Sequence, residues 1–273
     1  MKMKVKIFIL TWNDAEALDK NLKSLFEGFR HITSEFIEQI GLDIHVNIIN
    51  NHTEFHIDDS FKNHVNVIHN QGQPDFATAM IARMWNLAII HGFKNLNEPD
   101  CDVVLTAQDD AIWENDWIHK LLNIRYNFDF YAGDAGDLVC MHTVNSVKKI
   151  GLWDERFHYG FGEGDYFLRA IKYLPEKSSI NDYAHGRVWN SSLHLAKRPE
   201  PDASRYSEQS RAHRFRGLSW ENFLYKWKTH SLEGNWPEDI QNRVLTIAPV
   251  PSTIHYPYFE LDVENLKEKG YIV

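Results

Sequence analysis

The sequence predicts an α/β protein with a mixed, mostly parallel sheet flanked by helices. Apolar runs of strand length alternate with helical patterns through the first half of the chain, which is typical of successive β–α units. Polar residues directly follow several of these runs, as expected where ligands bind at the carboxyl ends of strands. Hydrophobic residues make up 43% and charged residues 25% of the 273 residues, which excludes a disordered chain and a coiled coil.

The first β–α unit has the clearest pattern. Residues 5–10 form a continuous apolar run of strand length. The next polar segment, Asn13-Asp14-Ala15-Glu16, resembles a capping box and predicts that a helix begins there. One face of this helix carries the apolar residues Leu18, Leu22, Leu25, Phe26 and Phe29.

Three more strands and two more helices are predicted before the middle of the chain. The strands cover residues 44–50, 65–68 and 101–106. One helix is predicted over residues 74–91, where apolar residues recur at helical spacing up to Gly92, and a second over residues 115–124. Strands that alternate with helices in this way form a mostly parallel sheet.

Beyond about residue 150 the pattern is looser. Residues 160–165 are rich in glycine and precede a short helix that ends at Leu174, and a strand is expected before His185. Residues 197–204 form a loop rich in proline and charge, and residues 207–230 are a helical stretch rich in arginine and aromatic residues. No linker divides the chain. We therefore expect a core of residues 1–195 and a C-terminal helical and loop extension of residues 196–273 packed on it.

Charge and cysteine content exclude several classes of protein. Lys and Arg number 29 against 38 Asp and Glu, a formal charge of −9, so a fold-wide attraction to nucleic acid or to anionic membranes is not expected. Cys101 and Cys140 are too few for a disulfide framework. No apolar run reaches the roughly 18 residues that span a bilayer. We expect a cytoplasmic protein with no integral membrane segment and no nucleic-acid partner.

Adjacent carboxylates follow the strand predicted over residues 101–106, in Gln108-Asp109-Asp110. Two neighbouring carboxylates repel each other, and the arrangement is favourable chiefly when a divalent cation or a set of donors neutralises it. Oxygen ligands suit Mn²⁺ or Mg²⁺. A solvated turn or helix cap is the alternative, because Asp is common in turns. The pair alone does not decide between them.

A second acidic segment, Gly162-Glu163-Gly164-Asp165, precedes the short helix. Glycine on both sides of Glu163 lets the backbone approach a ligand closely, and a carboxylate there can take a proton from a bound hydroxyl. A glycine-rich turn whose acids cap the helix is the alternative. Asp165 and Arg169 are spaced i and i+4, which predicts an ion pair.

Taken in order, these segments resemble the inverting glycosyltransferases of the GT-A fold, and are similar to the large family 2 of nucleotide-sugar transferases and its virus-encoded relatives. Between about residues 4 and 195 the matching segments are Ile9-Leu10-Thr11-Trp12-Asn13, Ile48-Ile49-Asn50-Asn51-His52-Thr53, 70–86, Gln108-Asp109-Asp110 and 151–169. Near the C-terminus, Tyr225-Lys226-Trp227 echoes a Lys-Trp of some relatives. The chain departs from the family at three points: Asn50 and Gln108 each stand where the family often has an acid, and Gly162-Glu163 replaces Glu-Asp.

The resemblance implies a metal-dependent transfer of a sugar from a nucleotide diphosphate sugar, with UDP favoured, to a hydroxyl of a glycan or glycoprotein, with inversion. It implies Mn²⁺ or Mg²⁺ held by Asp110, with His185 or His194 completing the metal shell. Glu163 falls on the catalytic carboxylate of the family, and Asp165 is the alternative base. The resemblance further implies that Asp109 holds the ribose, and the donor site as a whole comprises Thr11, Trp12, Asn13, Asn50, Asn86 and Asp109.

Aromatic residues are 13% of the chain, and flat amphipathic rings can stack on sugars. The candidates for stacking on the acceptor are Trp153, Tyr159, Phe161 and Trp189. Two other functions remain open at this point. A metal-dependent nucleotidyltransferase that makes nucleotide sugars could share the sheet and the paired acids, but it would usually carry a glycine-rich phosphate loop near the first strand. A non-catalytic carbohydrate-binding module is supported by the aromatic residues alone.

Overall fold

The fold is built on a central sheet of eight strands in the order β3-β2-β1-β4-β7-β6-β8-β9. A computed structural model describes residues 3–70, 81–134, 136–157, 161–182, 187–190, 193–199 and 216–227. The strands are β1 (Met3–Thr11), β2 (Leu42–Asn50), β3 (Val65–His69), β4 (Val103–Gln108), β6 (Phe130–Asp134), β7 (Val139–Thr143), β8 (Ser178–Asp182) and β9 (Arg187–Trp189). A second, small sheet pairs β5 (Ile112–Trp113) with β10 (Ala196–Lys197).

Most of the central sheet is parallel. β1 pairs in parallel with β2 and with β4, β2 with β3, and β6 with β8. β7 runs antiparallel to both of its neighbours, and β9 runs antiparallel to β8. The carboxyl ends of β3, β2, β1, β4, β6 and β8 therefore lie on one edge of the sheet. The mixed, mostly parallel sheet predicted from the sequence is confirmed.

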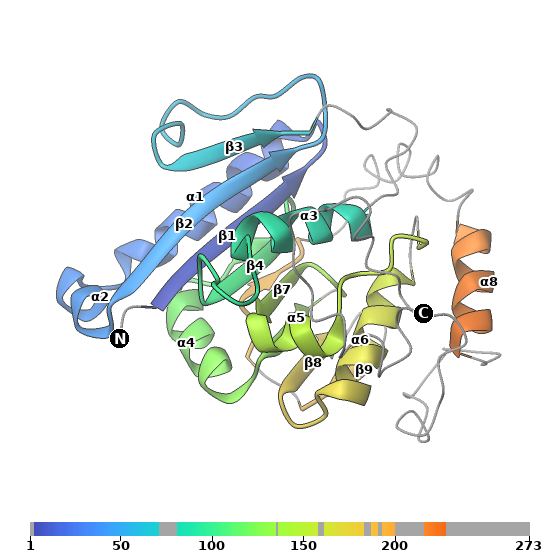
Figure 1. Cartoon of the computed structure of the whole chain (residues 1–273). Coiled ribbons are helices and arrows are strands. Elements are labelled where there is room, and N and C mark those ends of the chain that lie inside the picture. Colours follow the sequence, from blue (N-terminus) through green and yellow to red (C-terminus); the bar gives the residue numbers. More distant parts are fainter. Residues whose placement is uncertain are drawn as a thin grey trace.

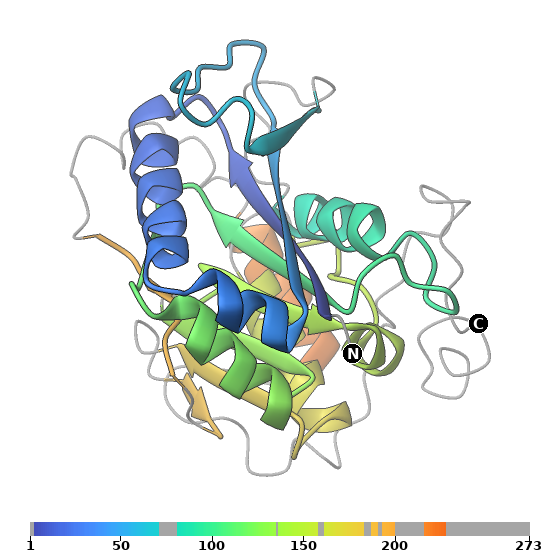
Figure 2. The same cartoon turned by 90° about the vertical axis from the view of Figure 1, so that its left-hand side faces the viewer.

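Helices cover both faces of the sheet, as Figures 1 and 2 show together. One face is covered by α1 (Ala15–Arg30), α2 (Ser34–Ile40) and α4 (Trp117–Asn127), and the other by α3 (Ile81–Phe93), α5 (Val144–Ile150) and α6 (Gly162–Tyr173). Alternate residues of β1 enter the two cores. Ile7 and Ile9 pack with α1 and α4, whereas Phe8 and Leu10 pack with α3. The period of two along a strand thus accounts for the continuous apolar run.

The last described helix, α8 (Arg216–Trp227), lies beside α6 (Figure 1). It falls within the helical stretch predicted over residues 207–230. Its Phe223 and Trp227 belong to the same hydrophobic core as α3 and α6. In the described part of the chain, no helix is long and apolar enough to cross a membrane.

The sequence located the first four strands and their helices, with shifts at their ends. β4 begins and ends two residues later than predicted, and its last residue is Gln108. The cap of α1 is Asp14, whose side chain accepts a hydrogen bond from the Ala17 amide at 2.9 Å, rather than Asn13. α3 is described from Ile81, and the first seven residues of the predicted helix lie outside the described residues. The elements α2, β5, β6, β7, α5, β9 and β10 were not predicted from the sequence.

Candidate active site

Three strand ends that the sequence analysis singled out lie next to one another at the carboxyl edge. Thr11 at the end of β1 pairs with Asn50 at the end of β2, and Leu10 pairs with Gln108 at the end of β4. Asp109 and Asp110 follow Gln108 directly. The predicted convergence of these segments is therefore present in the structure.

Arg198 joins the end of β4 to the segment that follows the small sheet. Its guanidinium donates from Nη2 to Gln108 Oε1 at 2.7 Å, and its Nε lies 3.2 Å from Asp110 Oδ2. β10 places it there, because Lys197 pairs with Ile112, two residues after Asp110. A cation thus lies against the carboxylate that the family resemblance assigns to a metal ion.

The turn between β6 and β7 brings another acid to the same edge. Asp137 accepts hydrogen bonds from Gln108 Nε2 and from the indole nitrogen of Trp85, both at 2.7 Å. Burial, and after it the neighbouring carboxylate of Glu163, raises the pKa of Asp137 to about 6. The Cγ of Glu163 lies 3.7 Å from the point that a Cβ on Gly136 would occupy. The first turn of α6 therefore faces this turn of the sheet edge.

The two acids of that helical turn have different surroundings. Asp165 is fully buried and accepts hydrogen bonds from Arg169 at 3.0 Å and from the Trp227 indole at 2.9 Å, while Lys226 Nζ lies 2.6 Å from its Oδ1. The Asp165–Arg169 ion pair predicted from the i, i+4 spacing is confirmed. Glu163 is only partly buried and faces the sheet edge. Of the two candidate bases, Glu163 is the one within reach of a ligand at that edge.

On the other side of β4, the predicted nucleotide-binding residues form a tight turn. Asn50 is fully buried, its Nδ2 donates to the His52 carbonyl at 2.7 Å and lies 3.3 Å from His69 Nδ1, and its Oδ1 accepts from the His52 amide at 3.1 Å. The Trp12 ring meets the His52 ring edge to face, with centroids 5.3 Å apart. Within the described residues, the indole nitrogen of Trp12 is buried with no hydrogen-bond acceptor. Asn13 follows with φ of 53°.

Two other predicted site residues lie in the interior. Asn86 is fully buried and holds the backbone of Trp153, accepting from its amide at 2.8 Å and donating to its carbonyl at 2.9 Å. The Trp153 ring is 1% exposed and stacks on Tyr166 with centroids 4.3 Å apart. Neither residue offers an open surface to a donor or an acceptor in this structure. Asn86 instead fixes the segment that leads to α6.

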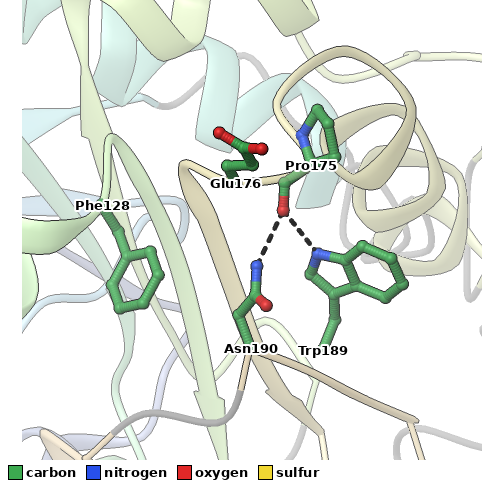
Figure 3. A pocket seen from close by; sticks show the side chains of 5 residues that line it. All are labelled: Phe128, Pro175, Glu176, Trp189 and Asn190. Carbon is green, nitrogen blue, oxygen red and sulfur yellow. Dashed lines mark hydrogen bonds between the residues drawn. The ribbon is translucent and has the colours of Figure 1, made fainter.

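Trp189 pairs with Ile180 in the middle of β8, and its indole is directed toward the opposite, amino edge of the sheet. Its indole and the Asn190 amide both donate to the Pro175 carbonyl, at 2.9 and 2.7 Å, as Figure 3 shows. Together with Phe128 and Glu176 these residues line an open pocket of about 610 Å³. Phe128 and Glu176 precede the first residues of β6 and β8. The Trp189 indole is therefore directed toward the amino ends of these strands, away from the carboxyl edge that Glu163 faces, which does not favour the acceptor role predicted for it.

Two predicted residues, His185 and Tyr159, lie outside the described residues. His194 is described, and its Nε2 lies 3.1 Å from Asn181 Nδ2 on β8. Among the described residues, no group of three or more His, Cys, Asp or Glu side chains is arranged to hold a metal ion. Mg²⁺ and similar ions at phosphate sites are bound by one or two carboxylates together with phosphate oxygens and water. The oxygen donors of Asp110 and Asp109 fit that type of site.

Two residues of this edge, Asp137 and Arg198, were not predicted from the sequence to belong to the site. Asp137 follows a glycine in Gly133-Asp134-Ala135-Gly136-Asp137, a pattern much like the one that marked Glu163, so a signal was present. Arg198 is one charge in a charged loop, and nothing in its immediate sequence points to Gln108, 90 residues earlier.

Comparison with known proteins gives similarity of fold only. No protein-family model and no curated protein sequence matches the chain. A mannosyltransferase from Pyrobaculum calidifontis, solved with GDP-Man and Mn²⁺, is similar with a TM-score of 0.48 and 10% identity over 86% of this chain and 66% of that one. Residues 1–349 of S. aureus TarS, solved with UDP, are similar with a TM-score of 0.47 and 12% identity over 84% and 73%. One fold hosts many activities, so the chemistry of this chain is argued from its own residues.

Proposed function

We propose that this chain is a metal-dependent glycosyltransferase that transfers a sugar from a nucleotide diphosphate sugar to an acceptor hydroxyl with inversion. One observation supports the proposal. The turn that contains Asp137 contacts both Gln108, two residues before the candidate metal ligand Asp110, and the candidate base Glu163. Ligands of open α/β sheets bind at this edge.

The nucleotide is assigned to the ends of β1 and β2. The buried indole nitrogen of Trp12 has no acceptor among the described residues, and a base or ribose oxygen would supply one. Asn50 shapes the turn beside it through its bonds to His52. Asp109 is assigned to the ribose, as the resemblance to the GT-A glycosyltransferases implies. UDP is the favoured nucleotide.

The diphosphate is assigned to the end of β4, where Asp110, with His185 as the second candidate ligand, would hold Mn²⁺ or Mg²⁺. When bound there, the ion supplies positive charge to the leaving diphosphate. Arg198 adds a second cation at the same place. Its ion pair with Asp110 balances the negative charge of that carboxylate before the donor binds. Its five N–H donors suit phosphate oxygens.

Glu163 is assigned the role of general base. It would remove the proton from the acceptor hydroxyl as the oxygen attacks the anomeric carbon from the face opposite the diphosphate. Its position in the first turn of α6, beside Gly136 and apart from the buried ion pair of Asp165, supports this assignment.

Calorimetric titration with UDP and with GDP, each with and without Mn²⁺, tests the proposal. We expect binding that depends on Mn²⁺ in the natural chain and is lost in Asp110→Ala, with the fold unchanged because the Asp110 side chain lies at a strand end outside the core. Equal affinity in Asp110→Ala would overturn the metal assignment. Absence of nucleotide binding under every condition would overturn the function itself.

A further inference from the structure

A row of three aromatic side chains runs along α8 from the interior to the surface. The row consists of Trp220, Phe223 and Trp227. The Trp220 and Phe223 rings are stacked nearly parallel, at 6° with centroids 6.4 Å apart, and the Phe223 and Trp227 rings are stacked at 27° with centroids 6.3 Å apart. Trp227 is 1% exposed and donates to Asp165, whereas Trp220 is only partly buried. The buried end is fixed by a hydrogen bond, so the outer ring is held in place by the rest of the row.

The outer end of this row meets Phe161, the residue that precedes α6. The Phe161 and Trp220 centroids are 5.0 Å apart with the rings tilted by 43°, and Phe223 lies 6.1 Å from Phe161. Phe161 has φ of 62°, a left-handed conformation that is unusual for a side chain of this size and is kept only where the surroundings impose it. The contact with α8 is such a constraint. Both rings remain partly exposed.

This ring pair lies close to the proposed base. Phe161 and Glu163 are two residues apart, so at most about 7 Å separates their Cα atoms. That distance is comparable to the width of one pyranose ring. The nucleotide is assigned to the ends of β1 and β2, across β4 from the β6–β7 turn that Glu163 faces. The side of Glu163 that carries Phe161 and Trp220 is therefore left for the acceptor.

We propose that Phe161 and Trp220 form the wall of the acceptor site and pack against the apolar face of an uncharged pyranose ring, whose hydroxyl is thereby presented to Glu163. This inference rests on the proposed function. Aromatic faces suit the C–H face of a sugar ring, and the fixed row lowers the entropic cost of binding. The neighbouring carboxylates of Glu163 and Asp137 disfavour an anionic acceptor.

Saturation-transfer NMR tests the wall directly. The probes are methyl β-glucopyranoside, methyl β-galactopyranoside and methyl α-mannopyranoside, each with UDP and Mn²⁺, with methyl β-glucuronide as the anionic probe. We expect saturation of the ring C–H protons of at least one neutral probe in the natural chain. Trp220→Ala should weaken that binding about tenfold, and Trp220→Phe should restore part of it. The glucuronide should bind more weakly than the neutral probe.

Tyr225→Ala is the matched control. Tyr225 lies on the same helix, is 60% exposed and does not belong to the aromatic row, so we expect the natural level of saturation. Circular dichroism of each variant, together with its Mn²⁺-dependent UDP affinity, separates loss of the wall from loss of the fold or of the donor site. Trp220→Phe keeps the test decisive if Trp220→Ala unfolds, because a naturally folded Trp220→Phe with unchanged probe binding overturns the wall.

The outcomes distinguish this inference from the function on which it rests. If UDP binds with Mn²⁺ but no neutral pyranoside is saturated, or saturation is equal in Trp220→Ala, the acceptor wall is overturned and the transferase proposal stands. If no nucleotide binds but a pyranoside depends on Trp220, the transferase proposal is overturned and the sugar-binding wall stands.

Discussion

Two clusters of charged side chains meet α6 through acids two residues apart, Glu163 and Asp165, and they differ in burial. The buried cluster comprises Asp154, Asp165, Arg156, Arg169 and Lys226. The edge cluster comprises Asp110, Asp137, Glu163 and Arg198. Among the described residues, the buried cluster has three cations for two acids, and the edge cluster has one cation for three acids.

The difference in burial between the two clusters indicates a difference in role. A buried charge is tolerated when every partner is in place, so the buried cluster is specific to one arrangement and fixes α8 against α6. The edge cluster is partly exposed where strands end, so its carboxylates are accessible to a ligand at that edge. Glu163 and Asp165 are two residues apart, but Asp165 belongs to a buried ion pair whereas Glu163 is accessible at the sheet edge.

Asp165→Asn should have the largest effect on stability. It leaves Arg169 and Lys226 buried with reduced compensation, and removal of one partner from a buried pair costs about 3 to 5 kcal/mol in free energy of unfolding. Urea denaturation measures this loss. Glu16→Gln is the control, because the exposed Glu16–Lys20 pair contributes about 1 kcal/mol or less. A loss of the same small size in Asp165→Asn would show that the buried cluster is not structural.

Glu163→Gln should have the largest effect on chemistry. Glutamine keeps the size of the side chain but cannot take up the proton, so turnover should fall by about 10² to 10⁴ while donor affinity changes by no more than a few fold. Steady-state rates and calorimetry give the two values. The comparison of the clusters would be reversed if Asp165→Asn abolished transfer with the fold intact while Glu163→Gln stayed active.

Asp137 should give stability a pH dependence that the buried cluster does not share. Its pKa is raised to about 6 in the folded chain, so the folded chain binds this proton more tightly than the unfolded chain. The stabilisation is present at low pH and is lost as pH rises through about 6. The difference in unfolding free energy between the natural chain and Asp137→Asn, followed from pH 4 to 7, isolates this contribution. In a Glu163→Gln background this pH-dependent loss of stability should shift to lower pH, because the Glu163 carboxylate raises the pKa of Asp137. An unchanged pH range would show that the two carboxylates do not interact.

Arg198→Ala should have the smallest effect. The exchange removes the cation that lies 3.2 Å from Asp110, so the affinity for Mn²⁺ alone should rise about two- to fivefold, as expected for a partly exposed ion pair. Calorimetry with Mn²⁺ in the absence of nucleotide measures it. Lys23→Ala, which removes a cation from an exposed pair on α1, should leave the Mn²⁺ affinity unchanged. Weaker Mn²⁺ binding in Arg198→Ala would show that Arg198 supports the metal site rather than competing with the ion.

The sequence by itself determined the features that depend on local spacing. Apolar runs and helical periodicity located β1, β2, β3 and β4 and their helices, because those signals lie within a few residues of one another. The sequence also located the carboxylates that follow β4, and it predicted the ion pair of Asp165 and Arg169, which are one helical turn apart.

Only the tertiary structure decided which side chains share a site. Sheet order and the reversal of β7 bring Asp137 to Gln108, and the small sheet brings Arg198 to Asp110. Packing buries Trp153 in the core, and a hydrogen bond to Pro175 directs the Trp189 indole away from the carboxyl edge. The physical reason is that a contact between residues far apart in the chain depends on the packing of whole elements, and no local pattern around either residue records which partner that packing brings to it.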